Sequence, residues 1–310
     1  MSAAVFTEGV ERKFGRVSAL EGITFSVRAG ELFGFIGADG AGKSTLFRIL
    51  VTLLLADQGT VEVLGLDAVR SYREIRRRAG YMPGRFSLYQ DLSVEENLRF
   101  FATIFGTSIE ENYELIGDIY TQLEPFKNRR AGKLSGGMKQ KLALCCALVH
   151  KPEVLFLDEP TTGVDAVSRM EFWQMLGRLK EQGITILVST PYMDEAVLCD
   201  RVAFMQEGRI LAIDTPSAIT KLFQKPLFAI RARETGRLIT LLRSSPNAHS
   251  VYAFGRAVHY TDNRSAIRPE ELLDALHKEG FTEIEVQRIE AGIEDTFMAL
   301  METKNGAAHG

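Results

Sequence analysis

The sequence has few cysteines, and it begins without the pattern of a secretion signal. Its three cysteines are an odd number without metal-ligand spacing, which argues against a disulfide framework or a metal site. Residues 1–10 contain Glu8 and no apolar core, unlike a signal peptide. We therefore expect buried thiols in a reducing, cytoplasmic compartment. The three residues are Cys145, Cys146 and Cys199.

The sequence also lacks a long apolar run and an excess of basic charge. Its longest apolar stretch, residues 46–56, contains Arg48 and is far shorter than the ~20 residues that a membrane-spanning helix needs. Any membrane crossing is therefore expected from another chain or segment. The net charge of -3 gives no broad basic surface for a phosphate backbone. We interpret the basic run at residues 73–78 as a solvated helix face, and we expect no nucleic-acid partner.

An alternation of strand and helix patterns predicts an α/β fold. Residues 17–27 show a β-like pattern, and residues 31–36 form a short apolar strand before a glycine-rich loop and a helical stretch at 43–55. Further buried-strand patterns at 154–157 and 184–189 have helical patterns between and after them. This alternation indicates a largely parallel sheet.

Two further regions have sequence patterns that differ from this strand-helix alternation. Ser93 and Glu96 have the spacing of a capping box and open a helical lobe at about residues 93–132. After Lys225, the order strand, helix, two strands, helix, strand and a last helix at 293–301 fits a small ferredoxin-like α+β domain. The predicted divisions are a large domain at 1–224, a small domain at 225–304 and a frayed tail at 305–310.

The glycine-rich loop has the pattern of a phosphate-binding loop, G-x-x-x-x-G-K-[ST], between a strand and a helix. Its glycines allow backbone N–H groups to surround phosphate oxygens, and the following helix directs its positive dipole end at the same charge. Lys43 is predicted to contact the β- and γ-phosphates and Ser44 to bind Mg²⁺. The motif is Gly37, Ala38, Asp39, Gly40, Ala41, Gly42, Lys43, Ser44 and Thr45.

Two carboxylates follow the buried strand at 154–157. Asp158 and Glu159 stand at the carboxyl end of that strand, where the ligand crevice of a parallel sheet lies. Asp158 is suited to hold Mg²⁺, directly or through water. Glu159 is placed to orient or polarise the attacking water, which makes it the candidate catalytic residue.

A third motif indicates the family. Ser135, Gly136 and Gly137 lie in the string LSGGMKQ, which resembles the signature of ABC-type ATPases. In that family two subunits stack head to tail, and each ATP lies between the glycine loop of one and the signature of the other. The resemblance, over residues 5–220, therefore implies that this signature contacts the nucleotide of a second ABC subunit. It also implies a P-loop NTPase fold of ABC type, with a parallel-rich sheet, an antiparallel N-terminal β subdomain and a helical lobe.

The resemblance implies further roles. Phe14 resembles the aromatic residue that stacks on adenine, and Asp165 lies in a string, GVD, that resembles the loop meeting the partner subunit. Residues 292–297 resemble the tail of drug- and cation-exporter ATPase subunits. The resemblance thus implies an ATP-hydrolysing subunit that works with ATP and Mg²⁺ and a transmembrane permease. It would lie peripherally on the cytoplasmic face of the membrane.

Two positions depart from the family pattern. Gly84 stands where the family has a glutamine that touches Mg²⁺ and water, and Pro191 stands where it has the switch histidine. Pro191 has neither a ring nitrogen nor a backbone N–H to donate. Losing one positioned donor commonly lowers a rate by about a hundredfold to a thousandfold. The chain's own site is therefore predicted to be slow.

These departures lead to a hypothesis and its alternatives. We expect an asymmetric pair, in which this chain holds ATP and its intact signature completes a faster site on a different subunit, as in the N-terminal half of tandem exporter ATPases. The alternatives are a homodimer that tolerates both substitutions, a soluble non-transport ABC protein, and an ATP-sensing regulatory subunit. The sequence names neither the transported substrate nor the partner.

Overall fold

The computed structural model describes the chain from Ala3 to Ala307, with side chains as far as Glu302. Its contacts divide the chain into two units, of which the first ends at Pro216 and the second begins at Ser217. The domain boundary after residue 224 stays a prediction. None of the helices in the described part of the chain is long and apolar enough to cross a membrane.

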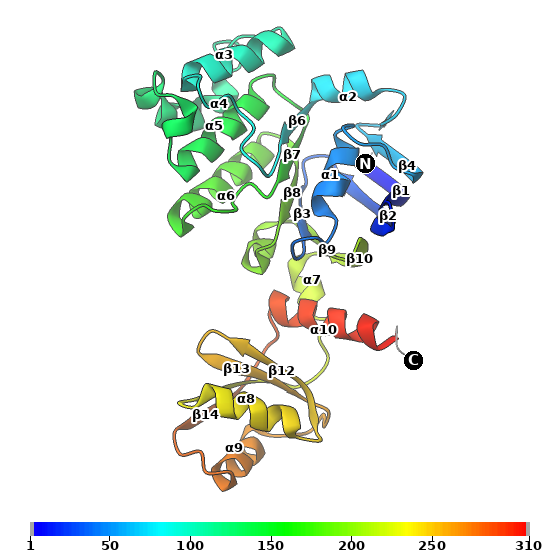
Figure 1. Ribbon diagram of the computed structural model, residues 1–310, viewed down its shortest axis with the longest axis vertical. Helices are drawn as coiled ribbons and strands as arrows, with labels where there is room; N and C mark the ends of the chain where they lie inside the picture. The colour runs from blue at the N-terminus through cyan, green and yellow to red at the C-terminus, as the bar shows by residue number, and fades with distance from the viewer. Residues whose placement is uncertain (1–2, 308–310) are drawn as a thin grey trace. The chain divides into compact units, whose positions relative to one another are not determined.

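A six-stranded sheet forms the centre of the first unit (Figure 1). Its order is β10-β9-β3-β8-β7-β6, and all neighbours are parallel except β9 and β10. Strands β3, β7 and β8 are buried along their whole length, which explains why they read as continuous apolar runs. The strands are β3 (Leu32–Ile36), β6 (Ala79–Met82), β7 (Val154–Asp158), β8 (Thr185–Thr190), β9 (Arg201–Gln206) and β10 (Arg209–Asp214).

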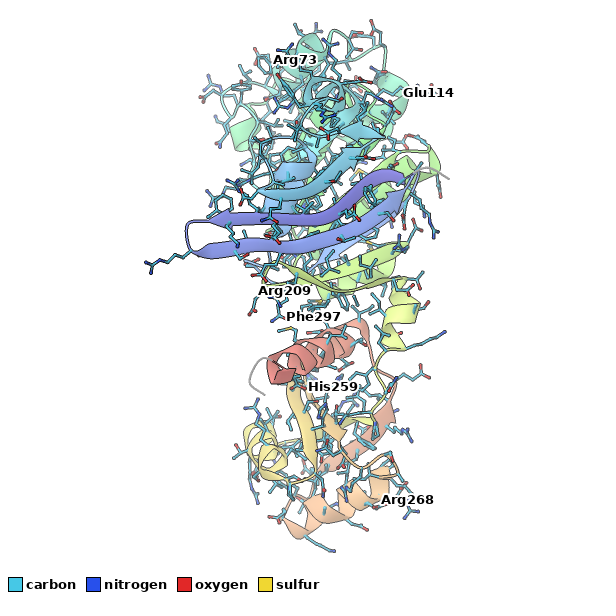
Figure 2. The ribbon with its side chains drawn as sticks, turned by 90° about the vertical axis from the view of Figure 1, so that its right-hand side faces the viewer. Arg73, Glu114, Arg209, His259, Arg268 and Phe297 are labelled. Atoms are coloured by element: carbon cyan, nitrogen blue, oxygen red, sulfur yellow. The ribbon has the colours of Figure 1, made fainter. Side chains whose placement is uncertain are left out.

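An antiparallel sheet of order β2-β1-β4-β5 forms the N-terminal β subdomain that the sequence predicts. Figure 2 shows the long β1–β2 hairpin at its edge. Helix α1 (Lys43–Leu50) contacts strands of both sheets, and a continuous apolar core fills the space around it. The strands are β1 (Ala3–Phe14), β2 (Val17–Arg28), β4 (Gln58–Val63) and β5 (Leu66–Asp67).

Helix α1 is shorter than the predicted helix at 43–55. The chain leaves the helix after Leu50, and Thr52 has a positive φ of 62°. The backbone N–H groups of Leu53 and Leu54 both turn back to the carbonyl of Arg48, at 2.8 and 3.0 Å. The prediction was wrong here because apolar composition continued past the point where the backbone reverses. The reversal lets the chain enter β4.

Backbone hydrogen bonds join the beginning of the helical lobe to its end. The Val94 N–H donates to the Arg129 carbonyl at 3.1 Å, and the Ala131 N–H donates to the Leu92 carbonyl at 2.8 Å. The predicted capping box is confirmed, since Ser93 caps the first helix and accepts from the Glu96 N–H. The lobe contains α3 (Val94–Phe105), α4 (Tyr113–Leu123), η1 (Glu124–Phe126) and η2 (Ala131–Lys133), after α2 (Tyr72–Arg78).

Helices pack against both faces of the six-stranded sheet. Helix α1 contacts β7 from one side, whereas α5 (Gly136–Leu148) and α6 (Ala166–Glu181) contact β6 and β8 and lie on the other side in Figure 1. After β8 the chain forms η3 (Met193–Leu198), and α7 (Pro216–Thr220) follows β10. The loops after β3, β6, β7 and β8 therefore all lie at one edge of the sheet.

The second unit has the predicted order of elements, with an antiparallel sheet of order β12-β13-β11-β14. This is the ferredoxin-like arrangement. Helices α8 and α9 supply buried residues to its core together with the inward residues of the sheet. The last helix begins at Ile293 as predicted and extends beyond 301. The elements are β11 (Leu227–Ala232), α8 (Thr235–Ser244), β12 (Ala248–Phe254), β13 (Ala257–Asp262), α9 (Pro269–Lys278), β14 (Ile284–Ile289) and α10 (Ile293–Ala307).

Candidate active site

The loop between β3 and α1 needs glycine at two positions for steric reasons. A Cβ on Gly37 would lie 2.3 Å from the Met205 carbonyl oxygen, and a Cβ on Gly42 would lie 2.5 Å from the Ala19 carbonyl oxygen. Gly42 also has a φ of 100°, which side chains disfavour. The tip of the loop is exposed and consists of Ala38, Asp39 and Gly40, whereas Ala41 is buried and Thr45 lies half-buried in α1.

Lys43 is the first residue of α1, and its side chain is nearly inaccessible, at 3% exposure. Its ammonium donates to the Gly37 carbonyl at 2.7 Å and to the Ala38 carbonyl at 3.0 Å. It also lies 3.3 Å from Oε1 of Glu159. A buried charge requires such partners. The arrangement holds a positive charge inside the loop, close to the carboxylate that follows β7.

Asp158 ends β7 and lies between two hydroxyl groups. Its Oδ1 accepts from Ser44 Oγ at 3.1 Å and from Ser189 Oγ at 2.6 Å, and the residue is 3% exposed. Burial, and then the negative charge of Asp158, raise the pKa of Tyr81 on β6 to about 12. Carboxylate and hydroxyl oxygens form the hard donor set that Mg²⁺ prefers. The cluster therefore fits this ion chemically.

Glu159 is held in an uncommon backbone conformation with a φ of 50°. Such a conformation costs about 1–3 kcal/mol when a residue other than glycine adopts it. The Glu159 N–H donates to both the carbonyl and the hydroxyl of Ser189, each at 3.0 Å, which holds the conformation in place. The carboxylate retains 21% exposure. Glu159 is thus fixed at its backbone while its side chain still reaches solvent.

Gly84 and Pro191 stand at the same edge and supply no side-chain donor. A Cβ on Gly84 would lie 3.0 Å from the Asp158 carbonyl oxygen, a tight contact, so the loop after β6 passes close to the end of β7. Pro191 directly follows β8. The two departures from the family pattern therefore lie at the same end of the sheet as Asp158 and Glu159.

A buried network that the sequence patterns did not predict joins the loops after β7 and β8. Glu195 is 2% exposed and accepts from Thr161 Oγ1 at 2.8 Å and from Thr190 Oγ1 at 2.5 Å. Ser189, which hydrogen-bonds to both Asp158 and Glu159, was likewise not assigned a role. The hydroxyl residues at the end of the predicted strand at 184–189 were the available signal. The network fixes the backbone on both sides of Pro191.

The signature and the GVD loop meet each other at the amino ends of α5 and α6. Ser135 caps α5 and accepts from the Met138 N–H at 3.3 Å. A Cβ on Gly137 would lie 2.7 Å from Ser168 Oγ, and Asp165 caps α6 by accepting from the Ser168 N–H at 3.0 Å. That hydrogen bond lowers the pKa of Asp165 below its usual range.

The same packing includes Gly136, whose Cβ position lies 3.5 Å from the carbonyl oxygen of Gly163. Among the described residues, no hydrogen bond or ion pair joins this group to Lys43 or Asp158. Phe14 is separate again: it ends β1, is 47% exposed, and has the Arg12 guanidinium 4.9 Å above its ring. A single chain therefore places the predicted site residues in three separate groups.

Comparison with known proteins supports the fold and the family together. Residues 20–162 match the family model described as ABC transporter. The chain is 40% identical over 220 residues to the Nod factor export ATP-binding protein I of Burkholderia lata, covering 70% of this chain and 72% of that protein. It is 38% identical over 308 residues to YbhF of Escherichia coli K12, a probable multidrug ABC transporter ATP-binding protein.

The extent of these matches differs. The YbhF match covers 97% of this chain but only 53% of the relative, so the chain spans about half the length of that protein. A solved ATP-binding subunit of an ABC transporter superimposes with a TM-score of 0.65 at 28% identity, over 71% of this chain and 93% of that chain. The ATP-binding cassette MJ0796, solved as a dimer with ADP and Pi, gives 0.62 at 25% identity, over 68% and 98%. The chain therefore belongs to the ATP-binding proteins of the ABC transporter family.

Proposed function

We propose that the chain binds ATP with Mg²⁺ at the carboxyl edge of the six-stranded sheet and powers a membrane exporter. The observation that carries this proposal is the convergence of Lys43, Ser44, Asp158 and Glu159 from two distant segments. The glycine loop and the amino end of α1 would hold the phosphates through backbone N–H groups and the helix dipole. Lys43 would exchange its loop carbonyl partners for phosphate oxygens.

The residues present also fit the metal ion. Ser44 and Asp158 would hold Mg²⁺, since their oxygens already lie 3.1 Å apart. When bound, the ion would neutralise charge on the transferred phosphoryl group. Ser189 orients the carboxylate through a 2.6 Å hydrogen bond. Glu159 would orient or polarise the attacking water, because its carboxylate is the exposed one of the pair.

The departures at Gly84 and Pro191 support slow turnover at this site. Neither residue presents a side-chain donor to the groups around Asp158. In contrast, the signature at residues 135–137 is complete and lies apart from the chain's own Lys43. We propose an asymmetric heterodimer, in which Ser135, Gly136, Gly137 and the Asp165 loop contact the nucleotide of a second ABC subunit and support faster hydrolysis there. Phe14 would stack on the adenine of the bound ATP.

Export is favoured over a non-transport role by the relatives, which are named as multidrug and Nod factor export proteins. A permease partner also has a surface available to it. An apolar cavity of about 270 Å³ lies between the helical lobe and β6, and its lining includes Met82, Phe101 and Phe105. A permease segment docked there would lie beside the loop that contains Gly84. In this arrangement the chain would lie peripherally on the cytoplasmic face of the membrane.

The direct test is the ATPase rate of the purified chain beside three variants. Glu159→Gln serves as the blank, and Gly84→Gln with Pro191→His restores both donors. Gly84→Ala with Pro191→Ala is the matched control, because it adds the Cβ that approaches the Asp158 carbonyl without adding a donor. We expect a wild-type rate near the blank and an increase of up to about a hundredfold for the restored chain alone.

Each other outcome decides between the alternatives. A wild-type rate far above the blank would contradict the asymmetric heterodimer and leave a self-sufficient homodimer. Binding of ATP without turnover in the restored chain, or with a complete partner subunit, would favour a regulatory ATP sensor. Copurification with a multi-spanning membrane protein would support the transport role, whereas a stoichiometric nucleic-acid complex would contradict it.

A further inference from the structure

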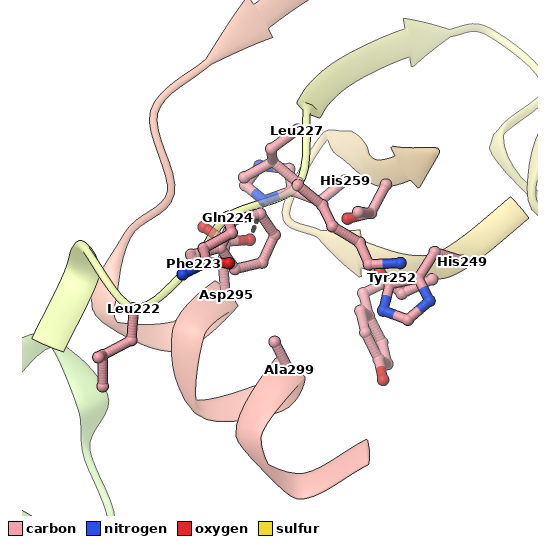
Figure 3. Close-up of a pocket in the computed structure, with 12 residues that line it drawn as sticks. Leu222, Phe223, Gln224, Leu227, His249, Tyr252, His259, Asp295 and Ala299 are labelled. Atoms are coloured by element: carbon pink, nitrogen blue, oxygen red, sulfur yellow. Dashed lines mark hydrogen bonds and ion pairs between the residues drawn. The ribbon is translucent and has the colours of Figure 1, made fainter. Parts of the chain in front are cut away.

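The second unit contains a cavity of about 230 Å³ that is separate from every residue assigned to nucleotide chemistry. It lies on the sheet face opposite the apolar core of that unit, between the strands, the segment after α7 and helix α10 (Figure 3). The cavity is lined by Leu222, Phe223, Gln224, Lys225, Leu227, His249, Ser250, Tyr252, His259, Thr261, Asp295 and Ala299.

Helix α10 forms one wall of this cavity and is fixed to the sheet by hydrogen bonds. Asp295 accepts from His259 Nδ1 at 2.6 Å and from the Gly292 N–H at 2.8 Å, and Figure 2 places His259 beside this helix. The Tyr252 hydroxyl donates to Glu302. The Tyr252 pKa is raised by burial and by that carboxylate, so the phenol stays protonated. Both acidic side chains of the wall are therefore engaged by protein donors.

The polar lining groups that lack a strong protein partner are all able to donate a hydrogen bond. Lys225 is paired among the described residues only with the neutral Oδ1 of Asn263, at 3.1 Å. The hydroxyls of Ser250 and Thr261 have no hydrogen-bond partner within the described part of the chain. His249 Nε2 lies 4.0 Å from Glu302 Oε2, which is too long for a hydrogen bond. One ammonium group that forms no ion pair among the described residues, and several groups able to donate, thus line the same cavity.

The remaining lining is apolar. Phe223 and Leu227 contribute hydrocarbon surface from the segment that enters β11, and Ala299 leaves space where a larger residue on α10 would fill it. Small-molecule sites typically combine such apolar walls with a few convergent polar groups. A metal ion does not fit, since the described residues contain no cluster of three ligating side chains.

We propose that this cavity is a binding site for a small amphipathic organic anion. The carboxylate or an equivalent anionic group would lie against Lys225, Thr261 and His249, and a flat or hydrocarbon body would lie against Phe223, Leu227 and Ala299. Binding would add contacts between α10 and the sheet. This inference does not depend on the proposed transport function, because it uses none of the residues at the nucleotide site.

The test measures the binding of three probes of similar shape to the full chain by calorimetry. The probes are 2-naphthoate, the neutral 2-naphthamide and the cationic 2-naphthylmethylamine. We expect 2-naphthoate to bind one site per chain, and to bind at least about tenfold more tightly than the other two, because a charge-assisted hydrogen bond contributes about 1.5–3 kcal/mol. The affinity should fall as salt is added, since the lysine is exposed.

Variants of the lining residues show whether 2-naphthoate binds in this cavity, and they distinguish the contribution of charge from that of the available space. Lys225→Gln should weaken 2-naphthoate binding about tenfold, whereas Lys225→Arg should retain it, as should Lys221→Gln, which removes a nearby lysine outside the cavity lining. Ala299→Leu should abolish binding by filling the space. Thr261→Val removes only the hydroxyl and should weaken binding severalfold. Thermal unfolding of each variant checks that the second unit is folded.

Several results would overturn the proposal. Failure of all three probes to bind the wild-type chain would do so, as would equal or tighter binding of the amine. Unchanged binding in both Lys225→Gln and Ala299→Leu would place the probe elsewhere. If Ala299→Leu does not fold, Lys225→Gln and Thr261→Val decide, because both keep the volume of the core unchanged.

Discussion

The four strand ends at the candidate site differ in what they offer a nucleotide. The ends of β3 and β7 lead to Lys43 and to the carboxylates of Asp158 and Glu159, and each of these groups has partners within 3.3 Å. The ends of β6 and β8 lead to Gly84 and Pro191, which contribute only backbone. The groups proposed to bind phosphate and metal are therefore held in position by protein partners, whereas the two donors of the family pattern at positions 84 and 191 are absent.

This difference implies that substitutions can change nucleotide binding and nucleotide hydrolysis independently in this chain. Substitutions after β3 should abolish nucleotide binding. Substitution of Thr190, the last residue of β8, should instead lower the stability of the loops, because its hydroxyl belongs to the buried Glu195 network.

Lys43→Ala should weaken ATP binding by at least about a hundredfold. The substitution removes two or more charge-assisted hydrogen bonds to phosphate, each worth about 1.5–3 kcal/mol. Calorimetry with ATP and Mg²⁺ measures the loss. Lys127→Ala, at an exposed lysine of the helical lobe, is the control and should bind as the wild type does. Near-normal binding by Lys43→Ala would place the nucleotide elsewhere.

Thr190→Val should lower the free energy of unfolding of the first unit by about 1–3 kcal/mol, because it leaves Glu195 with an unpaired oxygen in a buried position. Thr190→Ser keeps the hydroxyl and is the control. Urea unfolding measures both. The affinity for ATP should stay close to that of the wild type, and a large loss of affinity would contradict the separation between β3 and β8.

Ser44→Ala should weaken binding about tenfold when Mg²⁺ is present and much less when it is chelated. The hydroxyl is the proposed neutral ligand beside Asp158, so its loss should affect the ion rather than the phosphates. The measurement is ATP affinity with and without EDTA. Ser71→Ala, outside the site, serves as the control. Equal weakening under both conditions would show that Ser44 does not act through the ion.

His150 should produce the smallest effect, a loss of stability in acid. Burial lowers the pKa of His150 below its usual 6.5, although a hydrogen bond to the Ala79 carbonyl of β6 opposes the shift. As the pH falls below about 6.5, the unfolded chain takes up this proton before the folded chain does, so the free energy of unfolding falls.

Replacing His150 by phenylalanine removes this titration and should reduce the slope of stability against pH between 6.5 and the lower pKa of the folded state. Phenylalanine retains the stacking that the imidazole makes on Phe105 at 3.8 Å between ring centres. His277→Phe, at an exposed position of α9, should keep the wild-type slope. An unchanged slope in His150→Phe would mean that the lowered pKa of His150 does not contribute to the pH dependence of stability.

In the first unit, local sequence patterns predicted strands β2, β3, β7 and β8, the capping box and the family, but they overextended α1. Strands β3, β7 and β8 were recognisable because strands buried on both faces are uniformly apolar. The end of α1 was not, because it depends on the reversal at Thr52 that leads into β4. The Glu195 network was missed because its members come from segments that only the sheet brings together.

The sequence by itself determined which groups are present at the candidate site. Glycines at 37 and 42, Lys43 and Ser44 form a motif within one short segment, where the strand, loop and helix context is set by local propensity and spacing. The same holds for the missing donors at Gly84 and Pro191. These identities could be read without any knowledge of the fold.

Only the tertiary structure decided how these groups meet. Ser44 and Asp158 are 114 positions apart and share a hydrogen bond because parallel pairing aligns the ends of β3, β8 and β7. The cavity beside α10 likewise depends on a helix that packs across a sheet through His259 and Asp295. Such contacts arise from long-range pairing and burial, whose partners a local pattern does not specify.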